Sequence, residues 1–221
     1  MPTSEPSKSR SEAPRPISDE SARAGYLSKR LVSWDTETHL IQPGLLAPPI
    51  VTHQWASGEL ATLLRAREDL ASRIYNCAEN NALLCGQNIA YDFGCLLAAH
   101  PEMFETVWKL YERGQVYDLG IAALHNAIAD GRSRDGELYN QSGQKINRYS
   151  LDEVVKEVLG RTDAKSNDRF RLSYAMLEPL PTEQWPVEAR QYPLDDVRNG
   201  YDAARVMLEG EYANVADHRI Q

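Results

Sequence analysis

Two carboxylates one residue apart follow the first strongly apolar stretch of the sequence. Asp35 and Glu37 come directly after residues 31–34, a run that favours a β-strand. Successive side chains of a strand alternate between its faces, so both carboxylates are expected on the same face. Like charges on a nearly buried strand repel each other and resist desolvation. The pair therefore predicts a compensating divalent cation, whereas an isolated Asp-x-Glu could equally be a solvated strand end.

Two later positions could complete an acidic site. Asp92 follows a predicted buried strand and lies near the start of a predicted helix. Tyr192 and Asp196 are four residues apart in the predicted last helix, so their side chains share a face. Asp195, three residues from Tyr192, competes with Asp196 for this role. The acidic residues expected to converge at one edge of the sheet are Asp35, Glu37, Asp92 and Asp196.

The sequence pattern predicts strands mixed with helices, which indicates one α/β layer fold. Strands are predicted at residues 31–38, 50–56, 60–64 and 82–85, the first three as an antiparallel meander. Helices are predicted at residues 66–80, 102–113 and 151–159, and from residue 187 past residue 208. Two further helices are predicted to end at about residues 100 and 129, and a protruding hairpin is predicted at residues 136–150. The third strand has an alternative, because residues 59–80 could also form one long helix. Three tryptophans are expected in the core, namely Trp34, Trp55 and Trp108.

The composition is that of an ordinary globular protein, with 42% hydrophobic and 25% charged residues in a chain of 221. Residues 1–29 are rich in Ser, Pro, Arg and Glu and are predicted to be a disordered tail. We expect one domain at residues 30–212 and a C-terminal extension at residues 213–221. Because no window resembles a membrane helix or a secretory signal, a cytoplasmic protein without a membrane partner is expected.

The net charge of −8 limits how this protein could bind nucleic acid. Proteins that coat duplex nucleic acid nonspecifically need a basic face, which this composition does not favour. An enzyme that binds a strand end through bound metal ions is still compatible with this net charge, because the cations partly neutralise both the carboxylates and the phosphate.

The acidic residues occur in the order of three motifs. These are Asp-x-Glu at Asp35 and Glu37, Asn-x-x-x-Asp with a preceding aromatic at Asn88, Tyr91 and Asp92, and Tyr-x-x-x-Asp at Tyr192 and Asp196. In this order, over about residues 31–208, the chain resembles the proofreading 3′→5′ exonucleases of the ribonuclease H-like superfamily. It looks most like the exonuclease domain of phage and bacterial family-A DNA polymerases. A histidine variant of the third motif would need His in place of Gln191, so the tyrosine subclass fits.

The resemblance implies an α/β fold with a ribonuclease H-like mixed sheet, antiparallel in its first strands and flanked by helices. It also implies two Mg²⁺ or Mn²⁺ ions about 4 Å apart, which prefer carboxylate oxygen as ligand. Asp35, Glu37 and Asp196 would hold one ion, and Asp35 with Asp92 the other. Tyr192 would orient the attacking water, because a tyrosine with the ordinary pKa of about 10 is a poor base. Residues expected to contact the substrate are Thr36, Thr38, His39, Leu40, Asn88, Tyr91, Arg169 and Arg171.

The activity implied by the resemblance is hydrolysis at DNA 3′ ends, releasing nucleoside 5′-monophosphates in proofreading. The expected partners are a single-stranded or frayed DNA 3′ end and a DNA polymerase, in the cytoplasm of a bacterium or a phage-infected host. The sequence ends at Gln221, so either an excised polymerase domain or an independent exonuclease is expected. Two alternatives stay open: an exoribonuclease that trims RNA 3′ ends, and a noncatalytic module that binds nucleic acid or a polymerase.

Overall fold

A five-stranded mixed sheet forms the centre of the protein, in the order β3-β2-β1-β4-β5. The computed structural model describes residues 29–66, 68–162, 170 and 172–209. The strands are β1 (Leu31–Thr38), β2 (Ile50–Ser57), β3 (Leu60–Arg65), β4 (Leu83–Gly86) and β5 (Val116–Asp118). β1, β2 and β3 pair in antiparallel fashion, whereas β4 is parallel to both β1 and β5. The predicted α/β fold with antiparallel first strands is confirmed.

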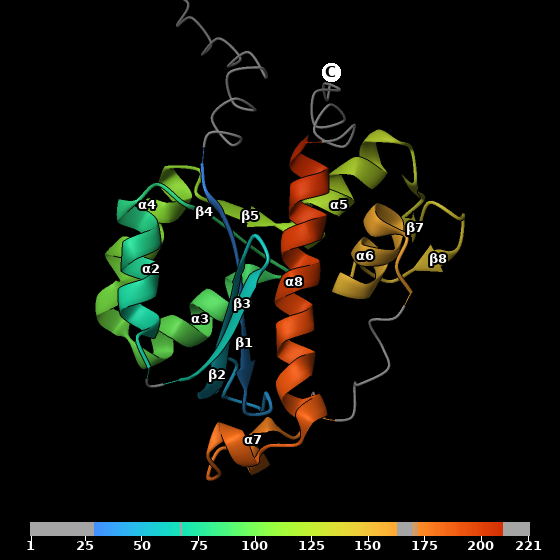
Figure 1. The fold of residues 1–221 in the computed structure, drawn as a ribbon. Coiled ribbons are helices and arrows are strands. Elements are labelled where there is room, and N and C mark those ends of the chain that lie inside the picture. Colours follow the sequence, from blue (N-terminus) through green and yellow to red (C-terminus); the bar gives the residue numbers. More distant parts are fainter. Residues whose placement is uncertain (1–28, 67, 163–169, 171, 210–221) are drawn as a thin grey trace, which may run out of the picture.

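Helices cover both faces of this sheet (Figure 1). They are α2 (Leu70–Glu79), α3 (Ile89–Ala99), α4 (Phe104–Glu112), α5 (Leu119–Ala129), α6 (Leu151–Leu159), α7 (Tyr174–Leu177) and α8 (Val187–Glu209), with 3-10 turns at Pro101–Met103 and Thr182–Gln184. Helices α2, α3 and α4 share one hydrophobic cluster with β1, β2 and β4, and helices α5, α6 and α8 share another with β4. Within the described part of the chain, no helix combines the length and the apolar character needed to cross a membrane.

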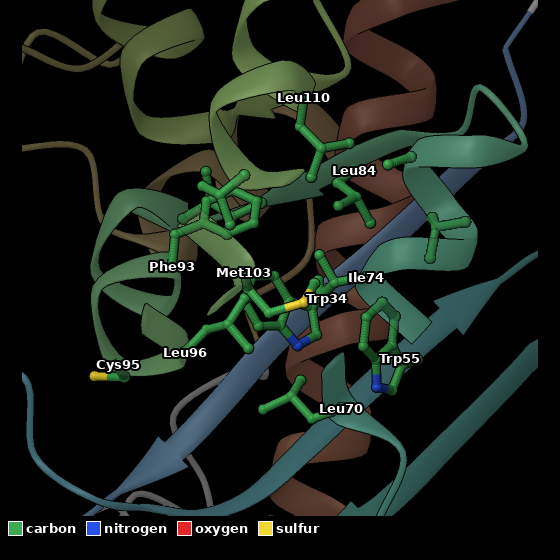
Figure 2. Packing of buried hydrophobic residues seen from close by; sticks show 14 of the residues in the cluster. Trp34, Trp55, Leu70, Ile74, Leu84, Phe93, Cys95, Leu96, Met103 and Leu110 are labelled. Atoms are coloured by element: carbon green, nitrogen blue, oxygen red, sulfur yellow. The ribbon is translucent and has the colours of Figure 1, made fainter. Parts of the chain in front are cut away.

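Within β1, alternate side chains face the main core and the opposite side of the sheet. Trp34 is fully buried among α2, α3 and α4, where its ring centroid lies 5.6 Å from that of Trp55 and 5.0 Å from that of Phe93. Figure 2 shows Trp34 in the middle of this cluster. Because side chains alternate along a strand, the residues on either side of Trp34 face the opposite way, toward α8. Asp35 therefore lies on the α8 side of the sheet.

The meander of the first three strands decides one alternative left open by the sequence. Residues 60–65 pair with β2 along their whole length, so a single helix over residues 59–80 is wrong. Helix α2 begins at Leu70, later than predicted. Asp69 before it has a left-handed backbone with φ 55°, so the helix cannot extend through this residue. The tight turn between β2 and β3 uses Gly58 at φ 62°, a conformation that glycine adopts without strain.

Two tryptophan predictions are confirmed and one is wrong. Trp34 and Trp55 are buried, but Trp108 on α4 is 57% exposed. Helix α4 buries Val107 and Leu110 instead, which leaves Trp108 on its outer side. The indole N–H of Trp108 donates to Glu112 one turn later at 2.7 Å, in a hydrogen bond that is exposed to solvent.

The predicted hairpin over residues 136–150 is present as part of a small second sheet. Its strands are β6 (Ser133–Arg134), β7 (Glu137–Tyr139) and β8 (Lys145–Ile146). The sequence pattern did not predict β5 or β6 as strands. The predicted tail and C-terminal extension lie outside the described residues except for Lys29, so these domain boundaries remain predictions.

Candidate active site

Three carboxylates from two elements meet at one side of the sheet. Asp35 and Glu37 of β1 and Asp196 of α8 each offer an oxygen, and these oxygens all lie within 4.8 Å of one another. Glu37 is buried, and the other two are partly buried. Helix α8 can approach β1 this closely because it carries Gly200 at the crossing. A Cβ atom at that position would lie only 2.9 Å from the Ser33 hydroxyl oxygen.

The structure also separates Asp196 from its neighbour Asp195. The carboxylate of Asp195 accepts a hydrogen bond from the Gln191 amide at 2.6 Å and lies 3.4 Å from the Arg198 guanidinium. Asp196 and Tyr192 instead line the same pocket as Asp35. The one-turn spacing of Tyr192 and Asp196 therefore brings both to the site, whereas Asp195 belongs to the surface network of α8.

Asp92 is the fourth carboxylate of this pocket and lies outside the close group of three. It is buried in the first turn of α3, where it accepts hydrogen bonds from the Thr36 backbone N–H at 3.0 Å and the Thr36 hydroxyl at 2.5 Å. Burial raises the pKa of Asp92 well above its usual range, and the nearby negative charge of Asp35 raises it further. A bound cation would relieve both effects, because it stabilises the ionised form.

Gln54 is a site residue that the motif analysis missed. It lies on β2 directly opposite Asp35, and its amide Nε2 donates to Asp35 Oδ2 at 2.6 Å. Its side chain is fully buried. A glutamine in the middle of a predicted strand is a usable sequence signal, but the strand register that pairs it with Asp35 is needed to interpret it.

Tyr174 is a second residue to which the sequence analysis assigned no role in the site. Its ring is buried with Val51 and Trp185, and Tyr192 packs against this group. Its hydroxyl donates to the carbonyl oxygen of Ala189 on α8 at 2.9 Å. Burial, followed by the proximity of Glu37, raises the pKa of Tyr174 far above its usual range, so its hydroxyl keeps its proton.

An open pocket of about 930 Å³ is lined by the four carboxylates Asp35, Glu37, Asp92 and Asp196 and by Tyr192. The residues predicted to contact the substrate that line it are Thr36, Thr38, His39, Leu40, Asn88 and Tyr91. Arg169 and Arg171 lie outside the described residues, so their role stays a prediction. The lining residues that the sequence analysis missed include Gln87, Ile121, Leu124, Arg148 and Tyr149.

Several of these lining residues are held by specific contacts. The hydroxyls of Tyr91 and Thr38 are 2.8 Å apart, and burial raises the pKa of Tyr91 to about 12. His39 Nε2 lies 2.7 Å from the carboxylate of Glu178, which follows α7. Asn88 is exposed and has a left-handed backbone with φ 57°, a conformation that asparagine tolerates better than most residues. The rim of the pocket is therefore partly ordered by contacts within the protein.

The charges of the pocket fit a divalent metal ion. Its described lining contains a single Lys or Arg, namely Arg148. The lining carboxylates are Asp35, Glu37, Asp92, Asp118, Asp152 and Asp196. One of these, Asp118, already accepts backbone N–H groups at the starts of α3 and α5. The close group of three offers only oxygen ligands, which suits Mg²⁺ or Mn²⁺ better than zinc or copper.

Comparisons with known proteins were made by sequence and by structure. No family model and no curated protein matches this sequence. The exonuclease domain of Nibbler from Aedes aegypti matches in structure at TM-score 0.52 and 12% identity, with 90% of this chain and 89% of that chain covered.

Two RNase D structures match in a similar way. RNase D of Escherichia coli, an exoribonuclease involved in structured RNA processing, matches at TM-score 0.54 and 17% identity over 86% of this chain. RNase D of Trypanosoma brucei in complex with RNA U12 matches at TM-score 0.55 and 14% identity over 87% of this chain. The match spans 41% of the first and 60% of the second of those chains. At such identities the likeness shows the fold, so the chain has the ribonuclease H-like α/β fold that these exonucleases share.

Proposed function

We propose that this protein is a metal-dependent 3′→5′ exonuclease that hydrolyses DNA from its 3′ end and releases nucleoside 5′-monophosphates. The observation that carries the proposal is the group of Asp35, Glu37 and Asp196, whose oxygens lie within 4.8 Å of one another. Asp92 lines the same pocket and adds the fourth carboxylate. The fold shared with exonuclease domains supports the proposal by analogy.

The carboxylates take separate roles in this proposal. Asp35, Glu37 and Asp196 would hold one Mg²⁺ or Mn²⁺ ion, and Asp35 with Asp92 a second. Bound in this way, divalent ions supply Lewis-acid chemistry for phosphodiester hydrolysis. The protein contributes orientation: Gln54 holds Asp35 by its amide, and the two donors of Thr36 hold Asp92. Tyr192 is assigned to orient the attacking water through its hydroxyl.

The pocket walls are suited to the end of a single strand. Leu40, Ile121 and Leu124 are partly exposed apolar side chains in the lining, and such surfaces can contact unstacked bases. Arg148 is available for a phosphate oxygen. Because six carboxylates line the pocket against this one arginine, phosphate binding should depend on divalent cations already held by the carboxylates. Mismatched ends would be preferred, because unpaired bases need less energy to separate.

RNA 3′-end trimming is the second candidate, and a specific observation favours it. Two of the similar structures are RNase D enzymes, one of them in complex with RNA. The order and spacing of the three motifs support DNA proofreading beside a polymerase, and that association rests on the motif resemblance alone. A noncatalytic binding module is disfavoured, because such a module would not need four carboxylates in one pocket.

The deciding experiment is digestion of a 5′-labelled single strand, as DNA and as RNA of the same sequence, with Mg²⁺ or Mn²⁺. We expect a ladder of shortening DNA products that disappears in EDTA. Asp196→Asn should lower the rate by about a hundredfold or more, whereas the matched control Asp195→Asn should stay close to wild type, because its side chain bonds to Gln191. Faster loss of RNA would favour the second candidate. No cleavage of either polymer by folded, metal-loaded protein would overturn the proposal.

A further inference from the structure

Helix α8 contains a proline at the point where it enters the proposed site. Pro193 lies inside α8 and directly follows Tyr192. Proline has no backbone N–H, so the carbonyl four residues earlier, that of Ala189, loses its usual helical donor. Ala189 and Pro193 are both buried. A buried carbonyl without a donor is unfavourable, so another group must bond to it.

The hydroxyl of Tyr174 supplies the missing hydrogen-bond donor. It donates to the Ala189 carbonyl oxygen at 2.9 Å, and the bond is buried. Tyr174 comes from α7, which Figure 1 shows beside the start of α8. The segment that follows α7 is tied to the sheet independently of α8. Arg65 of β3 donates to the Leu180 carbonyl at 2.9 Å, and its guanidinium lies 5.3 Å from the ring centroid of Trp185.

We propose that Tyr174 is a positioning residue of this site: its hydroxyl replaces the N–H that Pro193 lacks, and the bond holds the first turns of α8 in place. Tyr192 and Asp196 depend on those turns, because one precedes the proline and the other follows it by less than one turn. The ring of Tyr192 also packs against the cluster that contains Tyr174. The inference deepens the proposed exonuclease function and rests on it.

A double-mutant cycle tests the inference, because the chain allows a specific rescue. Tyr174→Phe removes only the hydroxyl and leaves the Ala189 carbonyl without this donor. Pro193→Ala restores a backbone N–H that can reach the same carbonyl through the ordinary helical bond. Tyr75→Phe is the control, because that side chain is 51% exposed on α2.

The expected result is a loss of kcat by about tenfold or more in Tyr174→Phe, with KM within about twofold, because displaced reacting groups lower the chemical rate. Adding Pro193→Ala to Tyr174→Phe should restore most of kcat, and Tyr75→Phe should leave it unchanged. A merely structural role would lower the melting temperature of Tyr174→Phe without changing kcat of the folded enzyme. That result, or a double variant as slow as Tyr174→Phe, would overturn the inference.

Hydrogen exchange separates a failure of this inference from a failure of the proposed function. If wild type cleaves neither polymer, the exonuclease proposal fails, but the cycle can still be followed through the backbone amides of residues 187–194. Tyr174→Phe should speed their exchange, and Pro193→Ala in that background should slow it again. Unchanged exchange in Tyr174→Phe would overturn the positioning role even if the wild type were an active nuclease.

Discussion

At the scale of single residues, two carboxylates of the pocket, Asp35 and Asp92, are held by partners from elsewhere in the chain. Asp35 accepts from Gln54 across the β1–β2 pair, and Asp92 accepts two hydrogen bonds from Thr36. These donors hold the acids in one orientation before any cation arrives. Groups that orient metal ligands in this way commonly change metal affinity or activity by about 10-fold to 100-fold when they are removed.

Gln54→Leu tests this support of Asp35. The change keeps a buried side chain of similar size but removes the amide that donates to Asp35 Oδ2. We expect Mn²⁺ affinity and kcat to fall by about tenfold or more, because the carboxylate is no longer held. Titration with Mn²⁺ and steady-state digestion of labelled DNA provide the two measurements. Wild-type Mn²⁺ affinity in a folded Gln54→Leu variant would contradict the assignment.

The raised pKa of Asp92 predicts that the stability of the metal-free protein depends on pH. Its folded-state pKa is raised above the ordinary value of 3.8 by burial and by Asp35. Above pH 3.8 the unfolded chain releases this proton more readily than the folded chain, so the contribution of Asp92 lowers stability as pH rises toward the raised pKa. The effect is absent below the ordinary pKa.

Asp92→Asn should therefore stabilise the metal-free protein while it lowers activity. The amide oxygen can still accept from Thr36, but the charge is gone. In EDTA at pH 7 we expect a melting temperature a few degrees above wild type, since about 1 kcal/mol shifts it by about 2–4 °C in a chain of this size. At pH 3.5 the two proteins should melt together. A lower melting temperature for Asp92→Asn at pH 7 would be the opposite result.

At the scale of elements, the site depends on how closely α8 crosses β1. Strand β1 supplies two carboxylates and helix α8 supplies the third. The crossing is close because Gly200 has no side chain where it meets Ser33. The helix itself was predictable from its periodicity, but its distance from the strand was not.

Gly200→Ala tests the crossing. Alanine favours a helix by about 1 kcal/mol over glycine, so a stabilisation would follow if the space were open. Because the new Cβ would lie 2.9 Å from Ser33 Oγ, we expect a loss of about 1–3 kcal/mol in the free energy of unfolding and a slower nuclease. Urea denaturation measures the first effect. Adding Ser33→Ala removes the opposing oxygen and should recover most of the loss; no recovery would mean that the contact is not limiting.

At the scale of the whole molecule, net charge and pocket charge have the same sign. The protein carries −8, and the described pocket lining has six carboxylates against Arg148. Divalent cations should therefore stabilise the folded state strongly, because they bind the native cluster and not the unfolded chain.

Mn²⁺ should raise the melting temperature in a way that depends on the close group of carboxylates. At a hundredfold excess over its Kd, a ligand adds about 2.7 kcal/mol, which corresponds to a rise of about 5–10 °C in a chain of this size. Thermal denaturation with and without Mn²⁺ measures the shift. Asp196→Asn should lose most of it and Asp195→Asn should keep it. Equal shifts in the two variants would place the cation elsewhere.

Local pattern in the sequence predicted most helices and strands in their order, the alternation along β1 and the shared helix face of Tyr192 and Asp196, but not β5 or β6. These features follow from the periods of strand and helix, and a short stretch of neighbouring residues is enough to show such a period. They also predicted the burial of Trp34, but not the exposure of Trp108. A residue's burial depends on which helix face meets the sheet, and this choice belongs to the packed molecule.

Which distant residues support the site follows from the packed structure. The register of β1 and β2 places Gln54 directly opposite Asp35, and its amide donates to that carboxylate. The hydroxyl of Tyr174 donates to the Ala189 carbonyl, a contact that no local sequence pattern encodes. Such contacts join residues that are far apart in the chain. They depend on long-range packing rather than on local period, and for that reason they could not be predicted from the sequence.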